Sequence, residues 1–275
     1  MIHSTGTLTS KDGLELFIQD WAPEIDRRAL IVLVHGLGDH SNRYSHLIQF
    51  LTDNAVKVCS FDQRGHGRSH GKRGHSPTYQ HLLDDIEIIL EHSKNLNPGL
   101  PVFLYGHSMG GNLVINFALR HKPKIMGVIS ASPALRPAFE PPALKIKAGR
   151  ILYNILPSIT LSNELDLRGV SRDKTVISEY NQDPLVHDRL SARLAVDLLD
   201  FGEWALDNAA QFPLPLLIMH GTDDRLTCHD ASQNFSQSFS KCRFKSFTGL
   251  YHELHNEPEK DQVFEVIGKW IEKRI

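Results

Sequence analysis

Short runs of apolar residues, each ended by a small or polar loop, recur along the chain. The clearest is Leu30 to Val34, an unbroken run of leucine and β-branched residues that His35 and Gly36 end. Such a run is typical of a strand whose two faces are both buried in a parallel sheet. We predict one strand at this run and one at each similar run, which lie at residues 56–61, 102–105, 127–130, 215–219 and 244–247.

Helical spacing of apolar residues fills the intervals between the first of these runs, at residues 43–53, 77–96 and 110–120. Before the first run, alternating apolar residues follow a turn at residues 11–13, which indicates an N-terminal hairpin. The repetition of strand and helix predicts the α/β class, with a mostly parallel central sheet and helices on both of its faces.

One segment, residues 134–212, interrupts this repetition. It contains no strong strand run, and prolines cluster where it begins and where it ends. We predict a mostly helical cap inserted into a single core, which residues 1–133 and 213–275 form.

The cap contains an amphipathic helical pattern. Its apolar positions are Leu144, Ala148, Ile151, Leu152 and Ile155, and Lys145, Lys147 and Arg150 lie elsewhere on the helical wheel. Such a helix either packs on the core or lays its apolar face on a lipid surface, as a peripheral membrane contact. The pattern is compatible with both.

Composition narrows the class of protein. Of 275 residues, 41% are hydrophobic and 23% are charged, and the net charge is -2. The chain therefore lacks the basic surface that nucleic-acid binding requires. We expect neither a signal peptide nor a membrane span, because charged residues interrupt the early apolar positions, and we expect a cytoplasmic protein. Cys59, Cys228 and Cys242 are widely spaced and are expected to be free thiols.

The most specific motif is Gly106-His107-Ser108-Met109-Gly110, which matches G-x-S-x-G. It follows a predicted strand and opens a predicted helix, which is the context that a nucleophile elbow requires. We therefore predict that Ser108 is a catalytic nucleophile.

A serine nucleophile needs a histidine base that a carboxylate orients, in the chain order serine, acid, histidine. The loop after residues 215–219 supplies Asp224 as the acid, and the strand at 244–247 leads to His252 as the base. His220 ends the same strand that precedes Asp224, so we take it to be too close to serve as that acid's partner. Asp223 is the alternative acid.

His255 is the alternative base. It lies three residues after His252 and is expected to share a helical face with it, where it could also contact substrate or face solvent.

Negative charge that develops on an ester carbonyl needs preorganised backbone donors. The turn His35 to Gly38 after the first buried strand is placed to supply the N–H of Leu37, and Met109 would supply the second donor. No phosphate-binding glycine motif is present, and His66 and His70 lack the carboxylates that would complete a metal site. We expect no cofactor and no metal.

Several segments carry a resemblance that spans nearly the whole chain. They are HGLGDHSNRY (35–44), FD (61–62), GHGRS (65–69), GHSMGG (106–111), YH (251–252) and, in the cap, SRDK (171–174) and YNQDPL (180–185). Together they resemble the monoacylglycerol lipase and lysophospholipase family of serine α/β-hydrolases. The resemblance implies the α/β-hydrolase fold with the cap as a lid.

The resemblance also assigns roles to residues. It implies Ser108, Asp224 and His252 as the catalytic triad, with Leu37 and Met109 as oxyanion donors. It further implies a glycerol-recognising end of the site near Asp39, Arg43, Tyr180 and His255. Family members often carry Glu where this chain has Asp39, and the eukaryotic lipases place a cysteine at the position of Thr227.

The expected reaction is release of a fatty acid from a monoacylglycerol through an acyl-enzyme. Lysophospholipids and short carboxylic esters are the alternative substrates, because the chemistry is identical and only the pocket separates them. Acyl transfer to an alcohol needs the same triad, but the chain has no H-x-x-x-x-D motif. A protein that only binds lipid would have no need for the three triad residues.

Overall fold

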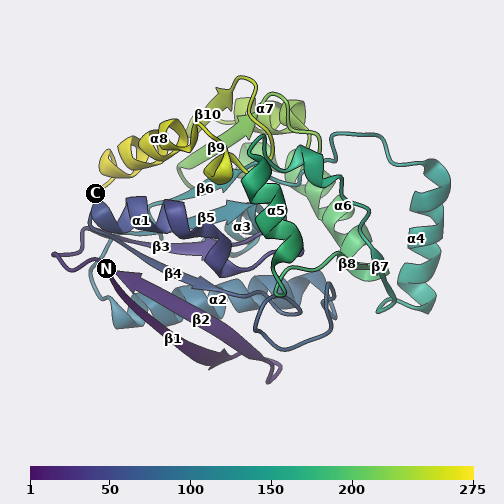
Figure 1. The fold of residues 1–275 in the computed structure, drawn as a ribbon, viewed down its shortest axis with the longest axis horizontal. Coiled ribbons are helices and arrows are strands. Elements are labelled where there is room, and N and C mark those ends of the chain that lie inside the picture. The colour runs from purple at the N-terminus through teal and green to yellow at the C-terminus, as the bar shows by residue number, and fades with distance from the viewer.

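The structure, a computed structural model, describes residues 1–275 and contains an eight-stranded central sheet (Figure 1). The spatial order is β1-β2-β4-β3-β5-β6-β9-β10. The strands are β1 (Ile2–Thr9), β2 (Glu15–Ala22), β3 (Ala29–Val34), β4 (Val56–Phe61), β5 (Val102–His107), β6 (Gly127–Ala131), β9 (Leu216–Gly221) and β10 (Cys242–Phe247). Only the pairs β1–β2 and β2–β4 are antiparallel. The predicted hairpin and mostly parallel sheet are confirmed.

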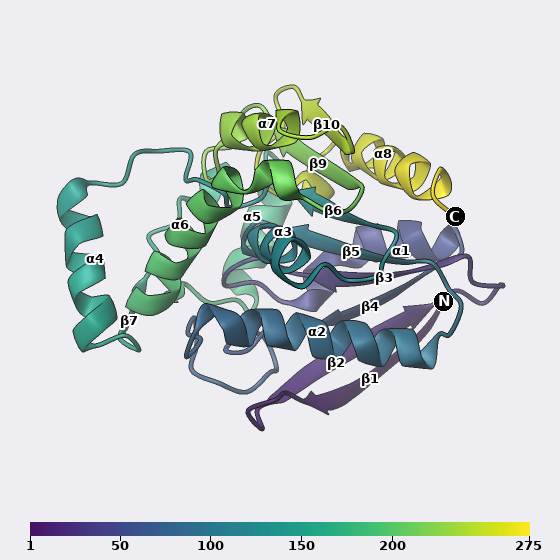
Figure 2. The same cartoon turned by 180° about the vertical axis from the view of Figure 1, so that it is seen from behind.

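Helices cover both faces of the sheet, as predicted (Figures 1 and 2). α1 (Ser45–Asp53) and α8 (Lys260–Glu272) pack on one face, and α2 (Tyr79–Leu96), α3 (Met109–His121) and α7 (His229–Gln237) pack on the other. Leu30, Val32 and Val34 of β3 join the second of these cores, whereas Ile31 and Leu33 join the first. The run reads as continuously apolar because each face of the strand has its own core.

The carboxyl ends of the parallel strands meet at one edge of the sheet. Two backbone hydrogen bonds join the loops that follow them there, from Ser108 N to Ala131 O (3.0 Å) and from Ser132 N to Met219 O (2.8 Å). Loops after β5, β6 and β9 are therefore fixed side by side, which is where ligands bind in open α/β sheets.

The segment between β6 and β9 is mostly helical. It contains α4 (Ala143–Ile155), β7 (Thr160–Ser162), the 3₁₀ turn η2 (Leu167–Gly169), α5 (Lys174–Gln182), β8 (Arg189–Ser191), α6 (Ala192–Asp207) and the 3₁₀ turn η3 (Ala209–Gln211). β7 and β8 pair as a small antiparallel sheet that the sequence did not predict, because three residues are too few to show alternation.

Two helices of this segment differ in their packing. α6 is held against the core, where Leu194 and Ala205 join a hydrophobic cluster and the Phe201 ring stacks on Tyr79. α4 has no buried residue, and its ion pair from Arg150 to Asp200 ties it to α6. In Figures 1 and 2, α4 stands at the margin of the molecule, away from the sheet. Of the two readings of this helix, packing on the core is therefore wrong. No helix has the length and apolar character needed to cross a bilayer.

Candidate active site

Ser108 occupies a sharp turn between β5 and α3. Its backbone has φ 54° and ψ −116°, a region that residues other than glycine seldom adopt. The glycines of the motif make this turn possible, since a Cβ on Gly106 would overlap the carbonyl oxygen of Gly110, and one on Gly110 would overlap that of Val34. Ser108 remains partly exposed between two buried neighbours, as a nucleophile must.

Asp224 and His252 come together across two loops. Asp224 follows β9, and His252 follows β10, and His252 Nδ1 lies 2.8 Å from Asp224 Oδ2. The other carboxylate oxygen, Oδ1, accepts backbone N–H bonds from Leu226 (2.8 Å) and Thr227 (3.0 Å). The Thr227 hydroxyl lies 2.8 Å from Oδ2. These contacts fix both the position and the rotation of a fully buried carboxylate.

The electrostatics of this pair favour an ionised acid and a basic imidazole. Burial alone would raise the pKa of Asp224, but the charge of His252 and hydrogen bonds from His220 and His252 hold that pKa well below its usual value. Burial would lower the pKa of His252, but Asp224 outweighs this effect and raises the pKa of the imidazole. A carboxylate can only accept, so the hydrogen of neutral His252 is on Nδ1 and Nε2 is free to act as a base.

The sequence argument missed a contact of His220. This residue is fully buried, and its Nε2 lies 3.0 Å from Asp224 Oδ2. Its position at the end of the strand suggested that it was too close to be a partner, whereas the loop folds Asp224 back onto the ring. The four-residue spacing in His220-Gly221-Thr222-Asp223-Asp224 was the available signal.

The two predicted oxyanion donors lie beside Ser108. A Cβ on Gly36 would stand 3.4 Å from the Ser108 Cβ, so the chain at Leu37 passes next to the nucleophile. Met109 is the first residue of α3, and the first N–H groups of a helix have no intrahelical partner. Both backbone donors are thus placed near the position where a carbonyl oxygen would lie.

The alternative acid and base lie in different surroundings. Asp223 is exposed and accepts a hydrogen bond from Thr222 Oγ1 (2.8 Å). The expected helical face shared by His252 and His255 is wrong, because the 3₁₀ turn η4 (Leu254–Asn256) begins after His252. His255 is also not solvated: its ring stacks on Tyr44 with centroids 4.4 Å apart, and burial lowers its pKa to about 4.

A buried ion cluster adjoins His252. Arg43 Nη2 lies 2.7 Å from Glu253 Oε2, and Arg43 Nε lies 3.0 Å from Asp39 Oδ1. The guanidinium stacks over the Tyr180 ring at 4.6 Å, and Tyr44 donates its hydroxyl to Asp39 Oδ2 (2.8 Å). Arg43, Asp39 and Tyr180 were predicted to be near one another, whereas Glu253 was missed.

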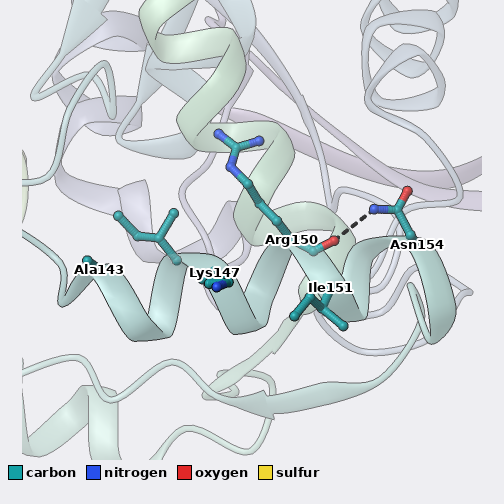
Figure 3. A pocket seen from close by; sticks show the side chains of 6 residues that line it. Ala143, Lys147, Arg150, Ile151 and Asn154 are labelled. Carbon is teal, nitrogen blue, oxygen red and sulfur yellow. Dashed lines mark hydrogen bonds between the residues drawn. The ribbon is translucent and has the colours of Figure 1, made fainter.

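The most prominent hollow on the surface, of about 480 Å³, lies elsewhere. All of its lining residues belong to α4, and Figure 3 shows Lys147, Arg150 and Ile151 among them. None of the candidate catalytic residues lines it, so we do not place the reaction there. No three His, Cys, Asp or Glu side chains are grouped closely enough to hold a metal ion.

Known proteins share this sequence and fold. A model of the family described as serine aminopeptidase S33 matches residues 25–259. An abhydrolase domain-containing protein of Dictyostelium discoideum is 38% identical over 281 residues, which cover 100% of this chain but only 30% of that protein. The monoacylglycerol lipase of Mycolicibacterium smegmatis is 33% identical over 262 residues, with 94% and 93% of the two chains covered.

The solved structure of Paleococcus ferrophilus monoacylglycerol lipase superimposes with a TM-score of 0.87 at 35% identity, covering 94% of this chain and 99% of that one. The family match covers most of the chain, and the fold agrees with it. The chain therefore belongs to the serine aminopeptidase S33 family of serine hydrolases, and its fold is the α/β-hydrolase fold.

Proposed function

We propose that the protein is a serine ester hydrolase that releases a fatty acid from monoacylglycerols. The observation that carries the proposal is the 2.8 Å contact between Asp224 and His252 at the sheet edge where Ser108 occupies its strained turn. The relatives from Mycolicibacterium smegmatis and Paleococcus ferrophilus, both named monoacylglycerol lipases, support the substrate class.

In the proposed reaction, His252 Nε2 takes the hydroxyl proton of Ser108 as Ser108 Oγ attacks the ester carbonyl. Asp224 stabilises the imidazolium that forms, and the N–H groups of Leu37 and Met109 stabilise the oxyanion. The bond to glycerol then breaks as His252 returns the proton to the leaving oxygen. Water, activated by the same histidine, hydrolyses the acyl-enzyme and releases the fatty acid.

We assign the polar end of the substrate site to Arg43, Tyr180 and His255. A Cβ on Gly38 would stand 3.5 Å from the Tyr180 hydroxyl, so this group adjoins the oxyanion turn. Both ring nitrogens of His255 are buried without a partner and can bond to glycerol hydroxyls. Both oxygens of Asp39 already have partners, so its role in the proposed site is to hold Arg43.

The same proposal makes residues 134–212 the cap of the site. Their backbone contacts the site loops directly: His187 N bonds to Gly38 O (3.0 Å), and Glu253 N bonds to Val170 O (2.8 Å). A shift of this segment would therefore reach the oxyanion turn and the histidine loop together.

α4 is proposed to contact a lipid surface. Leu144, Ile151 and Ile155 are 79%, 51% and 68% exposed, and cationic side chains stand elsewhere on the same helix. An exposed apolar face on a basic helix is typical of helices that lie at a membrane interface. The apolar hollow along α4 in Figure 3 belongs to this surface.

Replacing Leu144, Ile151 and Ile155 together with Ser should weaken binding to anionic phospholipid vesicles by about tenfold or more, since each loses apolar area that the interface would bury. Hydrolysis of a soluble short ester should not change, because α4 lies outside the site. Ile2→Ser with Ile25→Ser, at 60% and 61% exposed on the core, is the matched control. Equal vesicle binding by both variants would refute the α4 contact.

The substrate is tested by fatty-acid release from 1-monooleoylglycerol, a lysophosphatidylcholine of the same chain and a short nitrophenyl ester. Ser108→Ala is the blank. Monooleoylglycerol should lead in kcat/KM by tenfold or more, about 1.4 kcal/mol of transition-state discrimination. A lead for the lysophospholipid or the short ester would overturn the substrate assignment and leave the triad in place. No hydrolysis above the blank would overturn the proposal as a whole.

A further inference from the structure

His220 presents a second imidazole to the carboxylate that orients the candidate catalytic histidine. It lies on β9 two residues beyond Ile218, on the strand face that packs against α7. Its ring is fully buried, so both nitrogens need partners. Nδ1 finds Ser232 Oγ on α7 at 2.8 Å, and Nε2 finds Asp224 Oδ2 at 3.0 Å.

The chemistry of these partners fixes where the hydrogens lie. The ionised carboxylate of Asp224 only accepts, so His220 Nε2 carries the hydrogen and donates it. In the neutral ring, Nδ1 then accepts from the Ser232 hydroxyl. His252 Nδ1 donates to the same oxygen, Oδ2, at 2.8 Å. Two imidazoles therefore share one carboxylate oxygen.

We propose that His220 is a positioning residue that acts on His252 through Asp224: its hydrogen bond takes up part of the carboxylate charge and so lowers the proton affinity of His252. A base that holds a proton too tightly is unavailable at neutral pH, whereas one close to ambient pH serves best. Asp224 strengthens His252 as a base, and His220 limits that effect. The inference rests on the proposed function, in which His252 is the base.

Other groups also act on His252, and they must be held constant in a test. The acidic ones are Asp224, Glu253 and Asp39, and the rings of His107 (centroids 4.7 Å apart) and His255 stand on the same side of the fold. Around His220 itself are Asp224, Thr227, Ser232 and His229, whose ring centroid lies 5.6 Å away. None of these is changed by a substitution at position 220.

The test is a pH titration of His252 by NMR in protein with ¹³C-labelled histidine, with the signal assigned by its loss in His252→Gln. In His220→Leu, the pKa of His252 should rise by about 0.5 unit or more, because the Asp224 charge is no longer shared. His220→Gln keeps an N–H donor and should restore the pKa to within about 0.2 unit of the natural protein. His229→Gln, which has no contact with Asp224, is the matched control and should not move it.

The sign of the shift separates the proposal from a packing role. If His220 only held Asp224 in place, its loss would loosen the Asp224–His252 contact and lower the pKa of His252. A fall, or no change, would therefore overturn the inference. Where His220→Leu fails to fold, Ser232→Ala supplies the test: it removes the hydroxyl that fixes the ring and should raise the pKa of His252 in the same direction by a smaller amount.

Kinetics provide the second readout. The acid limb of kcat/KM for a short ester should move upward with the NMR value, and kcat at neutral pH should fall by about threefold to tenfold with KM changed less than about twofold. The NMR titration requires no turnover. A protein that hydrolyses no ester but shows the shift would fail the proposed function alone, whereas an active protein without the shift would fail this inference alone.

Discussion

Asp224→Asn is expected to lower kcat for ester hydrolysis by about 10⁴-fold while the fold remains intact. The reason lies in the rotation of the side chain. Backbone N–H groups of Leu226 and Thr227 point at Oδ1, so the amide oxygen of Asn must take that place. The amide NH₂ then faces His252 Nδ1, which must become an acceptor. The imidazole hydrogen moves to Nε2, and the base for Ser108 is lost.

The adjacent carboxylate provides the control. Asp223→Asn changes an exposed side chain that bonds to Thr222, and kcat should stay within about twofold of the natural value. The measurement is kcat with a soluble nitrophenyl ester for both variants, together with thermal unfolding by circular dichroism. A large loss with Asp223→Asn and a mild one with Asp224→Asn would mean that the acid had been assigned to the wrong residue.

The sequence predicted those parts of the site whose geometry is set locally. The elbow is recognisable because its glycines are required by atoms nearby in the chain, such as the carbonyl oxygen of Gly110 beside Gly106. The parallel sheet was predictable because each central strand is apolar on both faces. Asp224 and His252 followed from loop positions after late strands, since parallel strands bring such loops to one edge.

The parts that escaped prediction depend on distant or unusual contacts. Glu253 pairs with Arg43 across 210 positions, and no pattern of spacing links two residues so far apart. His220 reaches Asp224 only because the loop between them turns back, which a four-residue interval does not reveal. The apolar spacing of α4 predicted a helix correctly, but spacing cannot tell whether an apolar face meets protein, lipid or water.

The second large effect concerns stability: Arg43→Met should lower the free energy of unfolding by about 3–5 kcal/mol. The Arg43 side chain is 8% exposed, and its partners Asp39 and Glu253 are 4% and 5% exposed. Met retains much of the stem packing but removes the charge, which leaves two carboxylates buried without a cation. Urea unfolding followed by tryptophan fluorescence measures the loss.

Arg136→Met is the matched control, because exposure rather than geometry distinguishes the two arginines. Arg136 makes two 2.6 Å contacts with Glu203, but these side chains are 48% and 50% exposed. Water already solvates such a pair, so its loss should cost no more than about 1 kcal/mol. Equal small losses in both variants would show that Arg43 does not compensate the buried carboxylates.

The pH dependence of the Arg43→Met effect follows from the carboxylates. Burial would raise the pKa of Asp39, but Arg43, with His35 and His40, holds that pKa below its usual value. A depressed pKa contributes stability above the pKa of the unfolded chain, and this contribution is lost as the pH falls through the folded value. Without Arg43, burial dominates and Asp39 takes up a proton more readily. The stability difference between the natural protein and Arg43→Met should therefore be largest near neutral pH and shrink as the pH falls toward about 4. A difference that is constant with pH would mean that the variant loses packing rather than charge compensation.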